Sequence, residues 1–339
     1  MTESFSGRID KLRSLLDEAE CVLIGGGSGL SSAAGLTYSG QRFTENFGDF
    51  IKKYGMSDMY SAGFYPFKTQ EEKWAYWSRH ILLNRRLPPA LPLYRRLFEL
   101  VKDKDFFVVT TNVDAQFYKA GFATERIFAV QGDYGKLQCA KGCHDELYDN
   151  EDLVRKMAAE QKDCRIPSAL IPKCPVCGKD MEVNIRKDAY FVQDKAWYEA
   201  ERRYEIFCRE ARDRKLLLLE LGVGYNTPTI IRFPFEAMTY KNKDAVLVRI
   251  NAQYPGAMSR KRQKDAFFCR GYKRRVESDG LTHRCRPRCI RKRRKNAKRQ
   301  SVSHVMRKRK PECLRSYPSG GRGNKIKKSQ PPKHVYYVH

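Results

Sequence analysis

Four apolar residues at positions 21–24 lead directly into a glycine-rich segment at positions 25–35. The apolar run predicts a buried strand, and residues 30–34 can begin a helix immediately after the glycines. Glycines at such a strand end let the backbone approach a pyrophosphate, whose charge the N–H groups at the helix start then satisfy. Strand, glycine turn and helix therefore predict the opening of a doubly wound nucleotide-binding fold. A tight turn of small packing residues is the alternative.

Further strands and helices alternate along the chain. Apolar runs predict strands at residues 105–111, 127–130, 215–221 and 245–250. Helical spacing of apolar residues predicts helices at residues 9–20, 71–83, 88–101 and 197–212. Residues 133–190 contain five spaced cysteines, four of them in two close pairs, in otherwise irregular sequence. The alternation predicts an α/β fold with a Rossmann-like, doubly wound, mostly parallel sheet.

The basic character of the chain belongs to its last quarter. Residues 256–339 contain 28 Lys+Arg and 4 Asp+Glu, whereas residues 1–255 contribute only +3 to the formal charge of +27. This tail has no long apolar run and no periodicity, so it cannot bury enough surface to offset its ordering entropy. We expect a disordered basic tail. The abrupt change in composition also points to a reading-frame change or an unrelated appended sequence.

Binding of nucleic acid through this tail is a separate class of function. Its lysines and arginines would neutralise phosphates, with an affinity that falls steeply with salt. Its aromatic residues do not form the pattern of a stacking platform. The spacing of its histidine and cysteines fits no standard zinc finger: His283, Cys285, Cys289 and Cys313. The sequence therefore indicates nucleic acid only weakly.

The sequence contains no run of about 18 apolar residues, and its polar N-terminus lacks the apolar segment of a signal peptide. Eleven cysteines without a secretion signal point to a reducing compartment. There, clustered cysteines hold metal more often than they form disulfides. We expect a cytoplasmic protein without a membrane span.

Two close cysteine pairs, separated by 30 residues, have the spacing of a metal site. Four thiolates in tetrahedral geometry bind Zn²⁺. The predicted ligands are Cys139, Cys143, Cys174 and Cys177. No open coordination position is evident, so the metal is expected to be structural. Cys164 is a spare candidate, and His144 could compete as a ligand.

Small and polar residues follow three of the predicted strands, at positions 110–114, 129–133 and 222–224. Doubly wound sheets bind ligands at this edge. An asparagine and an aspartate there can hold ribose hydroxyls or a nicotinamide amide. Helix capping by Asn112 or Asp114 is the alternative.

These motifs together resemble the sirtuin family. Residues 27–35 are similar to the signature G-A-G-I-S-x-x-[SA]-G, and residues 110–114 to T-Q-N-I-D. The paired cysteines fall where sirtuins hold their structural zinc, and residues 222–224 and 250–251 resemble later NAD-contacting strand ends. The resemblance spans about residues 9–255. It implies NAD as co-substrate and a structural zinc.

The resemblance also implies a domain plan. A sirtuin-like catalytic domain would occupy residues 1–255, followed by the basic tail at 256–339. Its Rossmann part would comprise about residues 1–45, 105–132 and 190–255. A small inserted zinc-binding and helical domain would add a helical part at about 46–104 and a zinc module at about 133–189. The implied NAD contacts are Gly27, Ser28, Gly29, Leu30, Ser31, Asn112, Asp114, Gly222, Gly224 and Asn251.

The chain departs from deacylating sirtuins at one catalytic position. Where they place a His-Gly pair, this sequence has Gln131 and Gly132. The resemblance implies that the histidine removes a proton from a ribose hydroxyl, which a glutamine amide cannot do near neutral pH. Residues 1–255 contain only His80, on a predicted helix, and His144, beside the zinc cysteines. Neither is an obvious substitute.

Gln131, together with residues 37–40 and 222–228, is similar to the macrodomain-linked class M sirtuins of bacteria and fungi. That resemblance implies protein mono-ADP-ribosylation in place of deacetylation. It implies as acceptor a lipoyl-bearing carrier similar to glycine-cleavage protein H, and as partner a macrodomain that reverses the mark. Arg186 matches the arginine of the sirtuin L-R-P segment, with Lys187 in place of the proline. Arg186 could contact an acidic acceptor or a phosphate, or be an ordinary surface arginine.

The predicted catalytic residues are Asn112, Asp114, Gln131 and Arg186. The pyrophosphate would lie on residues 27–31 and the nicotinamide ribose near Asn112. Asp114 would hold the nicotinamide amide or a ribose group, and Gln131 would orient the acceptor or the ribose hydroxyls. A carboxylate acceptor is already a nucleophile at neutral pH, so transfer to it tolerates the loss of the histidine. The alternative is an NAD-dependent protein-lysine deacetylase or deacylase that tolerates Gln131.

Overall fold

A computed structural model describes residues 4–254, Gly256 and residues 335–338. The chain divides into two compact units, and all the described residues belong to the unit formed by Met1–Gly271 and Pro331–His339. The description that follows concerns this unit.

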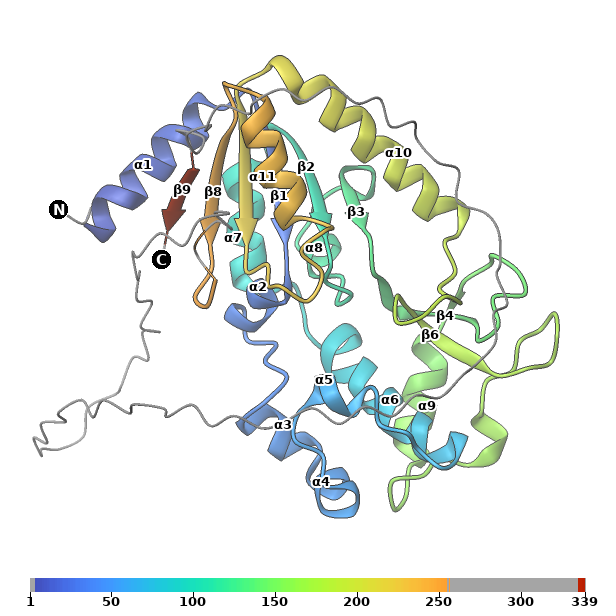
Figure 1. Cartoon of the computed structure of the whole chain (residues 1–339). Helices are drawn as coiled ribbons and strands as arrows, with labels where there is room; N and C mark the ends of the chain where they lie inside the picture. Colours follow the sequence, from blue (N-terminus) through green and yellow to red (C-terminus); the bar gives the residue numbers. More distant parts are fainter. Residues whose placement is uncertain (1–3, 255, 257–334, 339) are drawn as a thin grey trace, which may run out of the picture. The chain divides into compact units, whose positions relative to one another are not determined.

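The centre of the unit is a six-stranded parallel sheet in the order β3-β2-β1-β7-β8-β9 (Figure 1). Its strands are β1 (Cys21–Gly26), β2 (Asp105–Thr110), β3 (Ile127–Ala129), β7 (Leu216–Leu221), β8 (Val246–Ile250) and β9 (Val335–Val338). Gly26 is aligned with Thr110 on one side and with Leu221 on the other, so three strand ends meet at one edge. This arrangement confirms the predicted Rossmann-like sheet.

The sheet strands are apolar because helices cover both faces. Alternate residues of a strand point to opposite faces. Val22 and Ile24 pack in a cluster with Tyr94 and Phe117, while the intervening Leu23 packs on the other side. The surrounding helices are α1 (Phe5–Glu18), α2 (Ser28–Ala33), α7 (Pro92–Val101), α8 (Gln116–Lys119), α10 (Lys195–Glu210) and α11 (Arg232–Lys241). Single turns η2 (Thr124–Arg126) and η4 (Ala211–Asp213) join them to the strands.

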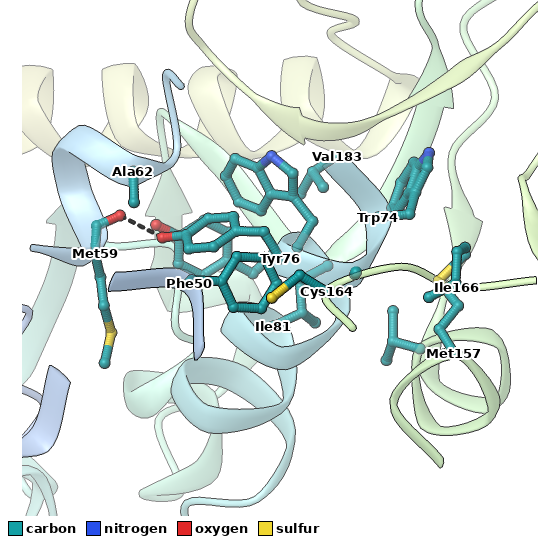
Figure 2. Packing of buried hydrophobic residues seen from close by; sticks show 14 of the residues in the cluster. Phe50, Met59, Ala62, Trp74, Tyr76, Ile81, Met157, Cys164, Ile166 and Val183 are labelled. Atoms are coloured by element: carbon teal, nitrogen blue, oxygen red, sulfur yellow. Dashed lines mark hydrogen bonds between the residues drawn. The ribbon is translucent and has the colours of Figure 1, made fainter. Parts of the chain in front are cut away.

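A helical part lies between β1 and β2 in the sequence. It consists of α3 (Gln41–Asn46), α4 (Gly48–Tyr54), α5 (Met59–Ala62), α6 (Gln70–Ile81) and the π-helix η1 (Leu82–Arg86). Figure 2 shows its aromatic core, in which the Tyr76 hydroxyl donates a 2.6 Å hydrogen bond to the Met59 carbonyl. Two predicted helices differ from the structure at their ends. The helix expected at 71–83 continues as a π-helix, and the helix expected at 88–101 begins only at Pro92.

The cysteine-containing segment is more regular than the sequence indicated. It contains a three-stranded antiparallel sheet in the order β5-β4-β6. Its elements are β4 (Gly132–Cys139), β5 (Tyr148–Asp149), α9 (Glu151–Glu160), η3 (Ser168–Leu170) and β6 (Met181–Ile185). The expectation of irregular sequence was wrong here, because β4 pairs with a strand more than 40 residues away and such pairing leaves little local pattern.

The predicted disorder of residues 256–339 falls mostly outside the described residues. Within the described part, Val335–Val338 pairs in parallel with β8, so the prediction was wrong for these four residues. Valine and tyrosine both favour strands, and the open edge of β8 offers unpaired backbone groups. Among the residues that the structure describes, no helix is long and apolar enough to cross a bilayer.

Candidate NAD and zinc sites

The backbone after β1 touches the backbone after β7. The Gly29 N–H donates a 2.9 Å hydrogen bond to the Gly222 carbonyl. A Cβ on Gly27 would lie 2.6 Å from the Gly222 oxygen, and Gly222 has a φ of +61°. Side chains would separate these two loops, so glycine is required for their contact. Ser28 and Gly29 are left exposed at the start of α2, with no side chain capping the helix.

Asn112 is bonded to the glycine-rich segment. Its Nδ2 donates to the Gly27 carbonyl at 3.0 Å, to Ser31 Oγ at 3.0 Å and to the Tyr94 hydroxyl at 3.2 Å. The sequence did not reveal Tyr94, which lies within α7 like any core aromatic. These contacts place the asparagine amide at the carboxyl edge of the sheet, beside the exposed start of α2.

Asp114 uses its two carboxylate oxygens differently. Oδ2 accepts a 2.5 Å hydrogen bond from Ser31 Oγ, and Oδ1 accepts one from the Gln116 N–H at the start of α8. Asp114 therefore contacts both the glycine-rich segment and the backbone at the start of α8, while its contact with NAD stays a prediction. The side chain is buried, and this burial raises its pKa, although the hydrogen bond from Ser31 opposes the shift.

Asn251 holds the loop that follows β7. Its Nδ2 donates to the Val223 carbonyl at 2.8 Å, and its Oδ1 accepts from the backbone of Gln253 and Tyr254. Gly224 lies in the same loop. Asn251 and Gly224 thus lie at the same edge of the sheet as Asn112. That they bind NAD stays a prediction.

Buried charges lie beneath this loop, and sequence reasoning missed them. Glu220, Arg232 and Arg249 have fully buried side chains. Arg249 Nε donates to Glu220 at 2.7 Å, and Arg232 Nη1 donates to Glu220 at 3.2 Å and to the Val223 carbonyl at 3.2 Å. Arg249 also pairs with Glu236 at 2.9 Å, so two carboxylates balance the two guanidinium groups, and Arg232 in addition fixes the loop backbone.

Gln131 and Arg186 are joined through their backbones. The Arg186 N–H donates a 3.0 Å hydrogen bond to the Gln131 carbonyl. The Arg186 side chain is exposed, and its guanidinium carbon lies 4.6 Å from the centre of the Phe191 ring and 5.6 Å from that of Trp197. Arg186 is therefore a surface arginine, as one interpretation had it, but one held against two rings beside Gln131.

Asp133, two residues after Gln131, forms an ion pair with Arg85. Arg85, from the π-helix η1, donates to both carboxylate oxygens of Asp133, at 2.7 and 3.1 Å. Asp133 also accepts from the Gly135 N–H at 2.6 Å. The start of β4 is thereby tied to the helical part, a contact between distant residues that no local pattern indicates.

Both histidines of residues 1–255 are engaged elsewhere. His80 is buried in the helical part, 3.1 Å from the Tyr76 hydroxyl through Nδ1, and burial lowers its pKa to about 3. His144 Nδ1 lies 3.1 Å from Cys143 Sγ, and its Nε2 lies 3.0 Å from the Tyr148 hydroxyl. In the described part of the chain, no hydrogen bond joins either histidine to Asn112, Asp114 or Gln131.

The four predicted cysteines come together. Their sulfurs all lie within 4.8 Å of one another, with Cys139–Cys177 at 3.7 Å and Cys143–Cys174 at 3.6 Å. Four sulfurs about 2.3 Å from a tetrahedral Zn²⁺ lie about 3.8 Å apart, so the cluster fits zinc. Burial opposes ionisation of Cys139, but backbone N–H groups outweigh it and lower its pKa to about 6.

Cys164, the spare candidate, is not part of this cluster. It is buried in the core of the helical part (Figure 2). Its thiol lies near Asp49, and burial raises its pKa to about 11. His144 does lie near the cluster, but four thiolates already complete a tetrahedron.

The similarity of the chain to known proteins agrees with this geometry. No protein-family model matches the chain. A protein ADP-ribosyltransferase of Staphylococcus aureus (strain Mu50 / ATCC 700699) is 42% identical over 241 residues, which cover 71% of this chain and 76% of that protein. The chain belongs to the ADP-ribosyltransferase family of sirtuins. It is an NAD-dependent transferase, and its four clustered cysteines could hold a structural zinc.

A second relative of this sirtuin is a "Probable bifunctional ADP-ribose hydrolase/ADP-ribosyltransferase" of Fusarium oxysporum f. sp. cubense. It is 33% identical over 272 residues, which cover 76% of this chain and 45% of the relative. The sirtuin thus spans less than half of the fungal protein.

Two solved structures are similar at lower identity. A Sir2 homolog–NAD complex has 15% identity and a TM-score of 0.45, covering 72% of this chain and 82% of its own. A structure from a study of the mechanism and regulation of Sir2 enzymes has 19% identity and a TM-score of 0.44, covering 74% and 88%.

Proposed function

We propose that this sirtuin transfers ADP-ribose from NAD to an acceptor protein and releases nicotinamide. The observation that carries the proposal is Gln131, bonded through its carbonyl to Arg186 at the position where deacylating sirtuins have a histidine. The Staphylococcus aureus relative, which is named a protein ADP-ribosyltransferase, supports the same activity.

The residues at the carboxyl edge of the sheet fit NAD. The exposed backbone of Ser28 and Gly29 offers room for a pyrophosphate, because glycine presents no side chain there. Asn112 and Asp114 would face the nicotinamide ribose, held in place by Ser31 and Tyr94. When bound, NAD supplies an electrophilic ribose carbon with nicotinamide as its leaving group.

The side chains around Gln131 would stop the reaction after transfer. Deacylation requires a base that removes a ribose proton, whereas a carboxylate acceptor attacks without one. A glutamine amide can orient the acceptor by hydrogen bonds but cannot take its proton. Arg186, exposed and stacked on Phe191, would attract an acidic acceptor.

For the acceptor we propose a lipoylated carrier similar to glycine-cleavage protein H, with a macrodomain as the partner that removes the modification. The name of the Fusarium oxysporum relative, which joins an ADP-ribose hydrolase to an ADP-ribosyltransferase, supports such a partnership. A cytoplasmic setting also suits the proposal, since the cysteines within the described ranges form no disulfide and four of them can hold zinc.

The test is incubation of the purified protein with NAD and lipoylated carrier, followed by intact-mass measurement of the carrier. An ADP-ribose adduct that depends on NAD and disappears with Asn112→Ala is the expected result. The unlipoylated carrier is the matched control for the acceptor. Deacetylation of an acetyl-lysine peptide without any adduct on the carrier would contradict the proposal and support the deacylase alternative.

A further inference from the structure

Two buried amides link the strands of the zinc module to the loop that follows Arg186. Asn184, on β6, is 3% exposed, and its Nδ2 donates to Gln138 Oε1 at 2.7 Å and to the Val192 carbonyl at 3.0 Å. Asn184 therefore holds the far end of the loop at residues 186–193.

Gln138, on β4, completes the connection. It is also 3% exposed. Its Oε1 accepts from the Val192 N–H at 3.0 Å, and its Nε2 donates to the Tyr190 carbonyl at 2.8 Å. The loop is thus bonded at positions 190 and 192, on both sides of Phe191.

Asn184 also lies very close to the backbone of Gly132, the residue after Gln131. Gly132 has a φ of +94°, and a Cβ there would lie 2.1 Å from the Asn184 backbone oxygen and 2.8 Å from its Oδ1. Only a glycine permits this approach. Asn184 therefore lies close to the residue after Gln131 and is hydrogen-bonded to the loop that carries Phe191.

We infer that Asn184 and Gln138 are positioning residues that hold Phe191 under the Arg186 guanidinium and so keep Arg186 beside Gln131. Arg186 to Tyr190 are exposed, so the loop has little packing of its own to hold it. The anchoring comes instead from two buried amides, which lose hydrogen bonds if the loop moves away. This inference rests on the proposed function for its catalytic consequence, but the anchoring of the loop can be measured separately.

The test uses the full chain with Asn184→Asp, which cannot donate to the Gln138 and Val192 oxygens. The matched control is Asn150→Asp. Asn150 is a buried amide of the same module that donates to the Tyr134 carbonyl and does not touch the loop. Zinc content and thermal midpoint are measured for both variants, so that general unfolding is recognised.

Limited trypsin digestion reports the loop directly. Asn184→Asp should accelerate cleavage after Arg186 or Lys187 by about tenfold or more, because the loop opens locally. Asn150→Asp should leave this cleavage as in the wild type. Unchanged cleavage in folded, zinc-loaded Asn184→Asp would overturn the inference, whatever the activity.

Steady-state kinetics of ADP-ribose transfer test whether the two amides position Arg186. Asn184→Asp should lower kcat for transfer by about 100-fold while KM for NAD stays within about twofold, as expected when a reacting group is displaced. In the Arg186→Ala background the same substitution should have no further effect, because it acts through Arg186. Additive losses would contradict positioning through Arg186. A wild-type protein that transfers no ADP-ribose would overturn the proposed function, whereas the digestion would still decide whether the amides hold the loop.

Discussion

The Ser31 hydroxyl donates a 2.5 Å hydrogen bond to Oδ2 of Asp114, a residue 83 positions further along the chain. Ser31 also accepts from Asn112, so the glycine-rich segment after β1 and the polar segment after β2 form one network. The hydrogen bond from Ser31 offsets part of the free-energy cost of burying the ionised Asp114 carboxyl. Burial nevertheless raises the pKa of this group above its ordinary value of 3.8.

The raised pKa of Asp114 predicts a specific pH dependence of stability. A carboxyl whose folded-state pKa exceeds its unfolded value stabilises the fold at low pH, and this contribution is lost as the pH rises through the folded pKa. Asp114→Asn does not titrate. The stability of this variant relative to wild type should therefore increase between about pH 4 and pH 8 in urea unfolding.

Asp105 is the control for this prediction. Although burial opposes the shift, hydrogen bonds from Arg214 and Arg126 lower the pKa of Asp105. Asp105→Asn should consequently lose stability relative to wild type as the pH rises to about 4, where the wild-type carboxylate reaches its full contribution, and should change little from pH 4 to pH 8. The same sign for both variants would contradict the environments described for the two carboxyls.

Gln131→His should introduce deacylase activity. An imidazole at this position can accept the ribose proton that the amide cannot, and a positioned base contributes about 10²–10⁴-fold to such a step. The measurement is hydrolysis of an acetyl-lysine peptide by mass spectrometry. Gln193→His, in the neighbouring loop, serves as control and should leave hydrolysis at the wild-type level. Failure of Gln131→His to raise hydrolysis in a folded protein would show that the amide is not what blocks deacylation.

Loss of one zinc ligand should unfold the zinc module. Cys143→Ser leaves three thiolates, so bound zinc should fall well below one ion per chain, with a cost on the order of several kcal/mol in stability. Cys164→Ala, in the helical core, should keep one zinc per chain. The measurement is metal analysis together with the thermal midpoint before and after chelation. Equal zinc loss in both variants would count against the four-cysteine site.

Glu220→Gln should be strongly destabilising. The change leaves Arg232 and Arg249 without their fully buried counter-charge, and breaking a buried ion pair costs about 3–5 kcal/mol. Glu236, which contacts Arg249 from a partly exposed position, provides the matched comparison. Glu236→Gln should cost clearly less in urea unfolding. A similar loss in both variants would mean that Glu220 is not the principal partner of the two arginines.

Local sequence patterns predicted the parts of the structure whose causes are local. Strands such as Leu216–Leu221 are buried on both faces, and this burial requires an unbroken apolar run that is visible in the sequence. The zinc cluster was predicted because its ligands come in close pairs, and Gln131 was noticed because it stands where a related motif has another residue. In each case the information lies within a few neighbouring positions.

The tertiary structure alone decided which distant residues meet. Nothing near Tyr94 indicates that its hydroxyl reaches Asn112, and nothing near Asn184 indicates that its amide holds Val192. Glu220 interrupts an apolar strand, and its partners lie 12 and 29 residues away. Such contacts depend on the crossing of strands and loops that are far apart in the chain, and a hydrogen bond between side chains leaves no periodicity in either segment. The polar network that surrounds the candidate site is therefore a property of the fold.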